Sequence, residues 1–279
     1  MPGPYRDIIV GTDGSATATA AVRAAAVLAR ACDARLVVAT AWYRHLHEAP
    51  SKAEQAMAYG ATNPSSHEAA WASETVSDAA GIARSHGVED VTIATPTGNA
   101  ADVLCKLGDE HPDSLIVVGT VGLGSAAERL VGNVPHQLTH HSSRDLFLIA
   151  RPQANEPAWR TVALATDGSP TAGVAVAHGH AVSRCLGAAA SLLTVARNED
   201  RGAAILDDVA ATLGAPDLGR QVVTGSHDIA GLLGQVAKDY DLLVIGNKGM
   251  SGPSRLLGSV SNKVTHQVPT DILLVNTTR

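Results

Sequence analysis

Aromatic residues are scarce in this chain, making up 3% of its 279 residues, and Phe occurs once. The core must therefore be built from Ala, Val, Leu and Ile, which suits small Ala-rich helices packed on Val- and Leu-rich strands. The scarcity also excludes the aromatic platforms on which single-strand binding proteins stack bases. Trp42, Tyr43, Trp71 and Trp159 are predicted to pack rather than to stack on a ligand.

A surplus of positive charge is also missing. The net charge is −6, with acids and bases interspersed, so we expect no nucleic-acid partner. No apolar run approaches the roughly 18 residues that a membrane-spanning helix needs, so we expect no membrane partner. The N-terminus lacks the charged and then apolar stretches of a signal peptide. Together these absences predict a cytoplasmic protein.

Cysteines are few, and histidines are poorly spaced for a metal. Cys32, Cys105 and Cys185 are far apart in the sequence and are predicted to be buried as small apolar side chains. The pairs His140–His141 and His178–His180 are adjacent or two residues apart and share no helix face. His45 and His47 are predicted to lie in a loop, where a surface position is the default interpretation. No protein-bound metal site is predicted.

What the sequence does contain is a duplication. Residues 12–15 read Thr-Asp-Gly-Ser after an apolar run, and residues 166–169 repeat them after another. A glycine pair with two residues between its members follows later in each half, at 119 and 122 and again at 246 and 249. The second copy is shorter between these two signatures. The piece that it lacks corresponds to residues 43–66, a polar stretch with little strand character.

Both halves alternate between short apolar runs and helical segments, which is typical of a parallel sheet covered on both faces. The expected strands are 7–10, 35–41, 91–94, 114–119 and 146–150, then 161–165, 190–195, 221–223, 242–246 and 272–275; the helices expected in the first half are 16–31, 67–86, 99–109 and 134–141. Right-handed crossovers then give an α/β fold of two tandem doubly wound domains, each a five-stranded parallel sheet flanked by helices. We expect domains at 1–151 and 159–279, with a Pro-containing linker at 152–158.

The repeated signatures follow strands that are predicted to be neighbours. Asp13 and Asp167 follow the first strand of each half, and Gly119 and Gly246 end the fourth. In open α/β sheets, ligands bind outside the carboxyl ends of the strands, where the strand order reverses. A glycine loop that leads into a helix N-terminus offers backbone N–H groups and a favourable dipole to a phosphate. The sequence therefore predicts a phosphate cradle in each half.

These motifs resemble the universal stress protein family in its tandem-domain form, and the resemblance covers nearly the whole chain. The carrying pattern is Gly-x2-Gly-x9-Gly-(Ser/Thr) after the fourth strand, with an Asp after the first. It implies the adenine nucleotide alpha hydrolase-like fold and ATP, with Mg²⁺, as the ligand. It also implies that the last strands, 146–150 and 272–275, pair across the interface between the two domains. The implied first site consists of Asp13, Ala41, Gly119, Gly122, Gly132, Asn133 and Val134, and the second of Asp167, Val195, Gly246, Lys248, Gly249, Gly258, Ser259 and Val260.

Each copy departs from the family pattern in its own way. The first keeps the nine-residue spacing but has Asn133 where Ser or Thr is expected. The second keeps Gly258 and Ser259 and supplies the cations Lys248 and Arg255, but its loop is one residue short. On electrostatic grounds the second site is predicted to be the better one for a triphosphate.

Other nucleotide-binding motifs fit the chain less well. A G-x-G-x-x-A match begins at Gly122, but it follows the fourth strand rather than the first, which disfavours a dinucleotide-binding dehydrogenase. A Walker A sequence is missing, and no base is placed as in kinases.

Three functional hypotheses follow. The first is an ATP-binding regulator or sensor in stress adaptation, at most a slow ATPase. The second is a protein that binds cyclic AMP or another adenine nucleotide. The third is a nucleotide-free interaction module. A homodimer is expected, and the sequence does not identify a regulatory protein partner.

Overall fold

The computed structural model describes residues 3–42, 64–120, 134–150, 157–247 and 258–278. We call residues 3–150 the first half and residues 157–278 the second half. The first contains β1 (Asp7–Gly11), α1 (Ala16–Cys32), β2 (Arg35–Ala39), α3 (Pro64–Ser85), β3 (Val91–Ala94), α4 (Ala100–Glu110), β4 (Ser114–Gly119), α5 (Val134–His141) and β5 (Asp145–Ile149). The second contains β6 (Thr161–Ala165), α6 (Pro170–Leu186), β7 (Ala189–Ala196), α7 (Glu199–Leu213), β8 (Gly219–Thr224), α8 (Ile229–Val236), the 3₁₀ turn η1 (Ala237–Asp239), β9 (Leu242–Gly246), α9 (Ser259–Gln267) and β10 (Asp271–Val275).

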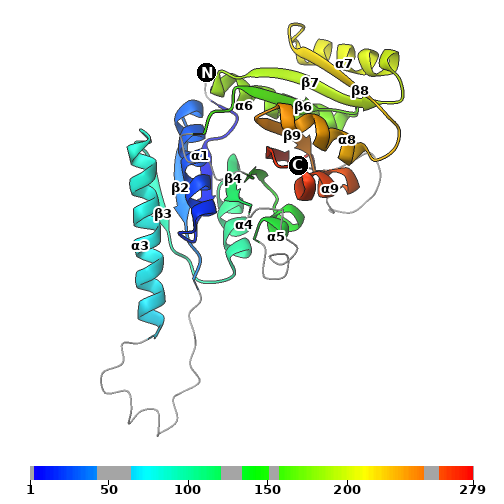
Figure 1. Cartoon of the computed structure of the whole chain (residues 1–279). Helices are drawn as coiled ribbons and strands as arrows, with labels where there is room; N and C mark the ends of the chain where they lie inside the picture. The colour runs from blue at the N-terminus through cyan, green and yellow to red at the C-terminus, as the bar shows by residue number, and fades with distance from the viewer. Residues whose placement is uncertain (1–2, 43–63, 121–133, 151–156, 248–257, 279) are drawn as a thin grey trace, which may run out of the picture.

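All ten strands form one sheet in the order β3-β2-β1-β4-β5-β10-β9-β6-β7-β8. Within each half every strand pair is parallel, which confirms the two predicted five-stranded sheets. The two last strands, β5 and β10, pair antiparallel with Phe147 opposite Leu273. This pair, which we call the seam, confirms the expectation that the last strands meet across the interface between the halves (Figure 1).

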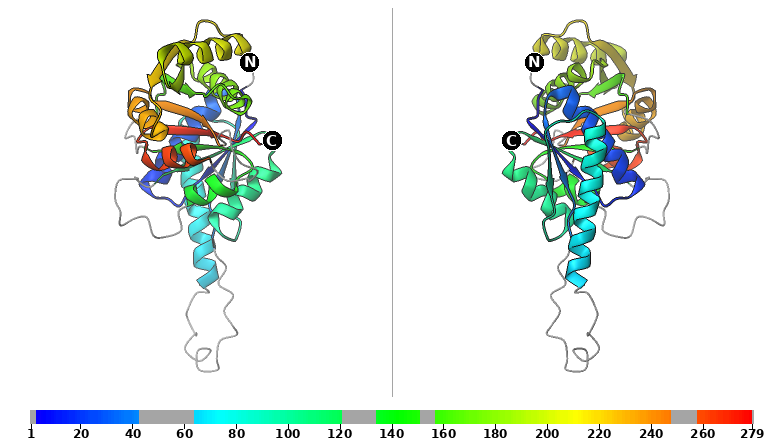
Figure 2. Two further views of the ribbon diagram at one scale, coloured as in Figure 1. Left: turned by 90° about the vertical axis from the view of Figure 1, so that its right-hand side faces the viewer. Right: turned by 90° about the vertical axis from the view of Figure 1, so that its left-hand side faces the viewer.

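Helices cover both faces of the sheet because successive side chains of each buried strand point to opposite sides. One core cluster joins Ile8 and Val10 of β1 to α1, α3, α6 and α7. The other joins Ile9 of β1 to α4, α5, α8 and α9. Figure 2 shows the helices on either side of the sheet, with α3 (cyan) extending well beyond it. No helix among the described residues is long and apolar enough to cross a membrane.

Two buried carboxylates tie the halves together at the seam. Asp145 begins β5 and Asp271 begins β10, and they are 0% and 2% exposed. Asp145 accepts a hydrogen bond from the amide of Asn276, at 2.8 Å, just after β10. Asp271 accepts one from the amide of Ala150, also at 2.8 Å, just after β5. The exchange is reciprocal, so each half supplies the hydrogen-bond acceptor that ends the other half's last strand.

An aromatic donor reaches each of these carboxylates at the same point of the repeat. The Tyr5 hydroxyl donates to Asp145 Oδ2 at 2.7 Å, and the Trp159 indole N–H donates to Asp271 Oδ2 at 2.9 Å. His178 on α6 adds a further contact to Asp145, with its Nδ1 2.9 Å from Oδ2. The duplication is thus preserved in hydrogen bonding even where the residue types have changed.

The burial of the Trp and Cys side chains agrees only in part with the prediction from the sequence. Trp159 is buried and Trp42 is half-buried, as predicted, but Trp71 on α3 is 44% exposed, so the prediction that it packs was wrong. Tyr43 lies outside the described residues. Cys32 is buried as predicted, whereas Cys105 and Cys185 are half-buried. Burial raises the pKa of the Cys105 thiol to about 11, and the nearby acids Asp109 and Asp102 add to the rise.

At the N-terminal end of β1, Asp7 forms an ionic cluster that is specific to the first half. Its Oδ1 lies 2.6 Å from Arg35 Nε and its Oδ2 lies 2.9 Å from His111 Nδ1. Burial raises the pKa of Asp7, but the hydrogen bonds and charges of Arg35 and His111 outweigh burial and hold the pKa below its ordinary value. The ionised form therefore stabilises the folded chain.

Replacing Asp7 with Asn is expected to lower the free energy of unfolding by about 1 kcal/mol at neutral pH, because Arg35 is partly exposed and its attraction is screened. The pKa of Asp7 is depressed in the folded state. The difference in unfolding free energy between the original chain and Asp7→Asn should therefore be complete above about pH 4 and should vanish as the pH falls below that value. Urea unfolding at several pH values measures it. Asp113→Asn is the control, because the Asp113–Arg6 pair is exposed and 3.6 Å long; an equal loss in both variants would contradict the prediction.

Candidate functional site

The repeated Thr-Asp-Gly-Ser block forms the same self-supporting turn in both halves. Residues 12 and 166 accept a hydrogen bond from the Gly amide two positions on, and residues 13 and 167 accept one from the Ser amide two positions on. The glycines have φ of +78° and +80°, which other residues rarely adopt. Each serine then caps a helix by accepting from the amide three positions on. Every residue of the block therefore has a local structural role.

The two aspartates keep one oxygen for other partners. Asp13 and Asp167 are both exposed at the carboxyl ends of β1 and β6. Each uses Oδ1 to hold the turn, at 3.0 and 2.9 Å from the Ser amide. Within the described ranges, neither Oδ2 has a hydrogen-bond partner. A carboxylate oxygen thus points to solvent at the same place in each half, and it can accept from a hydroxyl or bind a cation.

The strand order brings the two repeated signatures together. β1 pairs with β4 and β6 pairs with β9, so the Asp turn and the start of the glycine loop lie on adjacent strand ends, at the predicted reversal of strand order. Gly119 at the end of β4 is closely packed: a Cβ there would lie 2.5 Å from the carbonyl oxygen of Thr17 in α1. This position needs glycine for close packing of the strand end against the first helix.

In the second half, the glycine loop ends at an open helix N-terminus. Gly258 is the N-cap of α9, and no side chain among the described residues caps that end. The Gly258 amide donates to the Asn247 carbonyl at 2.8 Å, which ties the two ends of the loop together. The exposed Ser259 begins the helix, and the Ser261 hydroxyl donates to the Gly246 carbonyl at 2.7 Å. Uncapped N–H groups and the helix dipole make this end suitable for an anion.

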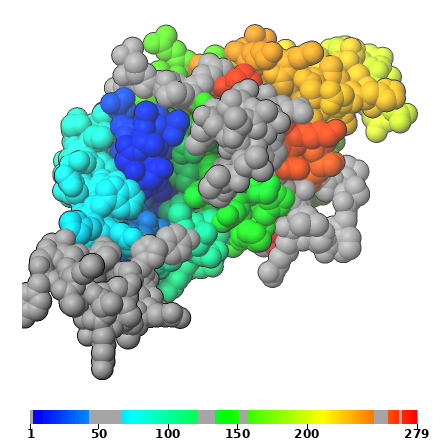
Figure 3. Space-filling view, turned by 60° about the horizontal axis from the view of Figure 1, so that its bottom comes forward, coloured from blue at the N-terminus to red at the C-terminus, as the bar shows by residue number. Residues whose placement is uncertain are grey.

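The remaining predicted site residues are only partly described. Val134 begins α5, Ala41 follows β2, and Val195 lies near the end of β7; all three are half-buried. They lie on the same edge of the sheet as the Asp turns. The other predicted positions, Gly122, Gly132, Asn133, Lys248 and Gly249, fall outside the described residues. Figure 3 views the molecule from below, with the first half (blue and cyan) at one side and the second (orange and yellow) at the other.

We call the strand-end region of the second half that carries Asp167, Val195 and the start of α9 the second crevice. A cavity beside it was not predicted from the sequence. A cavity of about 400 Å³ lies beyond the ends of β7 and β8 and is lined by Arg197, Gly225, Ser226 and His227. These residues belong to no recognised motif. Aligning the two halves strand by strand would have marked Arg197 as a cation at a strand end. Among the described residues, no group of three His, Cys, Asp or Glu side chains is placed to hold a metal ion.

Comparison with known proteins settles the family. The model of the universal stress protein family matches residues 4–150 and 207–276, which together make up most of the chain. The chain belongs to the universal stress protein family. Its two matched regions fit the tandem α/β architecture that the single ten-stranded sheet displays.

Some relatives of this universal stress protein match about half of the chain, and others match nearly all of it. Universal stress protein Rv1636 of Mycobacterium tuberculosis is 35% identical over 147 residues, covering 52% of this chain and 96% of the relative. A universal stress protein of Mycolicibacterium smegmatis is 27% identical over 292 residues and covers 96% of both chains. A crystal structure of an Archaeoglobus fulgidus universal stress protein matches 97% of this chain with a TM-score of 0.71 and 16% identity, a likeness of fold.

Proposed function

We propose that this universal stress protein binds a nucleoside triphosphate, ATP in the first instance, and acts as a regulator or sensor rather than as a dedicated enzyme. The observation that carries the proposal is the uncapped N-terminus of α9, which lies beyond the same sheet edge as Asp167. Ser169 caps α6 with its own hydroxyl, whereas no side chain in the described ranges caps the first amides of α9. An anion is the natural partner for such amides.

Each part of the crevice fits one part of the nucleotide. The amides at Ser259 and Val260 suit the phosphates, and the outward oxygen of Asp167 suits a ribose hydroxyl or an Mg²⁺ ion carried by the phosphates. Strand-end backbone groups near Val195 suit the base. When bound, Mg²⁺ would neutralise phosphate charge.

Mass spectrometry of the nucleotide released from the purified protein tests the proposal directly. Recovery of ATP supports it, and recovery of cyclic AMP would favour a cyclic-nucleotide binding protein instead. If no nucleotide is recovered and titration calorimetry shows no binding of either at millimolar concentration, the chain is an interaction module.

A single substitution at the start of α9 separates phosphate binding from folding. We expect Ser259→Asp to weaken ATP binding by at least about tenfold, because its carboxylate would repel the phosphates. The same carboxylate suits the helix dipole, so the unfolding midpoint should stay unchanged or rise. Titration calorimetry and thermal unfolding measure the two effects. Ser259→Asn is the neutral control, and unchanged ATP affinity in Ser259→Asp would exclude phosphate binding at α9.

A further inference from the structure

The two halves can be compared residue by residue at the outer end of each crevice. Trp42 pairs with Thr97 in a bridge beyond β2 and β3, and Ala196 pairs with Thr224 at the ends of β7 and β8. The next amides confirm the match: Gly98 donates to the Trp42 carbonyl at 2.9 Å, and Gly225 donates to the Ala196 carbonyl at 2.8 Å. Trp42 and Ala196 are therefore equivalent positions.

This exchange of Trp for Ala leaves room in the second half. The indole N–H of Trp42 donates to the Thr95 carbonyl at 2.8 Å, so the side chain lies across the end of β3. The buried Ala196 fills no comparable space, and the cavity of about 400 Å³ lies just beyond it. The second crevice is thus extended on the side where the proposed function places the base.

Arg197 is the cationic side chain in the lining of this extension. Arg197 is exposed and has five N–H donors, and within the described part of the chain it forms no ion pair. The Ser226 hydroxyl lies 3.0 Å from His227 Nδ1. The neighbouring acid, Asp228, uses Oδ1 to accept from the Gly231 amide and cap α8. The guanidinium of Arg197 is thus the cationic donor group that the cavity lining offers to a ligand.

A second donor at the end of β7 is also unused. Thr194 is 1% exposed, and its hydroxyl has no hydrogen-bond partner among the described residues. The equivalent hydroxyl of Thr40 donates to the Thr12 carbonyl at 2.6 Å. The first half thus satisfies its strand-end hydroxyl internally, and the second half does not.

We propose that the second crevice selects a 6-oxopurine nucleotide, carrying guanine or hypoxanthine, over an adenine nucleotide, with Arg197 reading the base. The inference rests on the proposed binding of a nucleoside triphosphate and changes the preferred base for the second half, where ATP becomes the weaker ligand. A 6-oxopurine presents two adjacent acceptors, O6 and N7, that match the fork of an arginine. Adenine replaces O6 with an amino donor, which faces the arginine donors unfavourably.

Titration calorimetry of the full chain with ATP, ITP and GTP tests the selection, since ATP and ITP differ only in the base, at position 6 and the adjoining N1. We expect ITP and GTP to bind one site about tenfold more tightly than ATP does. Arg197→Ala should remove that preference by weakening ITP about tenfold, while the ATP affinity changes by no more than about twofold. The exposed arginine should be replaceable without loss of folding.

Arg201→Ala is the matched control, since Arg201 is an exposed arginine on α7 that does not line the cavity. Equal affinity for ATP and ITP, or equal effects of the two arginine substitutions, would overturn the selection while leaving nucleotide binding intact. Equal weakening of ATP, ITP and inorganic phosphate by Arg197→Ala would mean that Arg197 binds a phosphate, and would also overturn it. If no purine nucleotide binds at all, the proposed function itself fails.

Discussion

Asp145→Ala is expected to lower the free energy of unfolding by about 3 to 5 kcal/mol. The side chain is fully buried and accepts from the Tyr5 hydroxyl, from the Asn276 amide and from His178 Nδ1. Removing the carboxylate leaves buried donors unsatisfied, and the cost of burying those donors without partners is larger than the value of the hydrogen bonds themselves. Because Asn276 belongs to the other half, the substitution should weaken the seam as well as the first half.

Urea unfolding measures the loss, and Asp217→Ala is the control because Asp217 is exposed between α7 and β8. Asp145→Asn keeps the volume and one acceptor, so it should cost less than Asp145→Ala. A loss no greater than that of Asp217→Ala would contradict the role given to the buried carboxylate. A similar ranking is expected for Asp271, which holds the Ala150 amide and the Trp159 indole.

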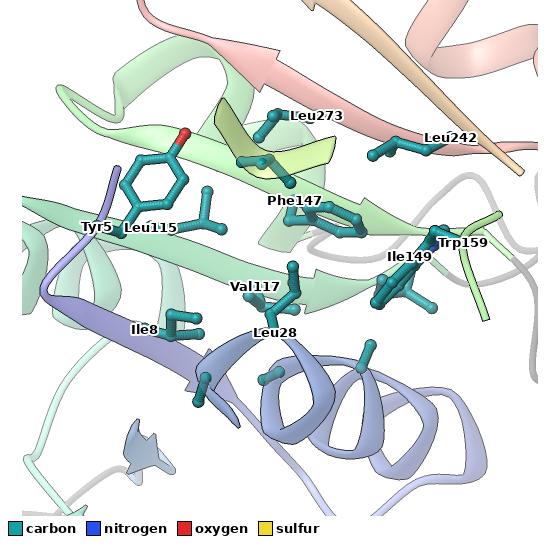
Figure 4. Close-up of a cluster of buried hydrophobic side chains, with 14 of the residues drawn as sticks. Tyr5, Ile8, Leu28, Leu115, Val117, Phe147, Ile149, Trp159, Leu242 and Leu273 are labelled. Atoms are coloured by element: carbon teal, nitrogen blue, oxygen red, sulfur yellow. The ribbon is translucent and has the colours of Figure 1, made fainter. Parts of the chain in front are cut away.

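Phe147→Ala is expected to cost about 3 to 5 kcal/mol of unfolding free energy, because it removes the only Phe of the chain from the middle of the seam. The ring is 0% exposed and lies edge-on to Trp159, with 5.1 Å between ring centroids. Figure 4 shows it between Val117 of β4, Leu273 of β10 and Trp159. The residues around it come from both halves, so the cavity would open at their junction.

Phe147→Leu is the matched variant, because it keeps most of the volume and should cost less than about 1.5 kcal/mol. The same urea experiment ranks the two variants. A loss below about 1 kcal/mol for Phe147→Ala would show that the seam can repack around the gap, which a tightly packed interface does not allow.

The fold was predictable because its information is local and duplicated. Apolar runs such as 114–119 and 242–246 are short and alternate with helical segments, and both ends of each strand were predicted correctly. The seam was expected only from the family resemblance. Nothing in the sequence around Asp145 or Asp271 shows that each carboxylate reaches an amide of the opposite half. Such long-range polar contacts depend on how two surfaces meet, which no local pattern records.

The candidate site was predictable only where a motif carried it. Asp13 and Asp167 lie at the expected strand ends, but their block also makes a turn and a helix cap, so its repetition has a structural cause besides any ligand. Arg197 and His227 were missed because neither belongs to a repeated motif. The paired strands before them, β7 and β8, are also longer than the corresponding β2 and β3, which hides the correspondence between the halves. Their places relative to the first half become visible only once the strand pairing shows that Ala196 is equivalent to Trp42.

The antiparallel seam has a consequence for biosynthesis. β5 is complete when about half of the chain has left the ribosome, whereas its partner β10 is the last strand to be made. At ordinary translation rates the nascent first half waits for roughly ten seconds with the apolar edge of β5 uncovered. An uncovered strand edge is a template for pairing with other chains. Crowded polysomes would thus favour mispaired first halves, and chaperone binding at Leu146–Ile149 would shield this edge until the chain is finished.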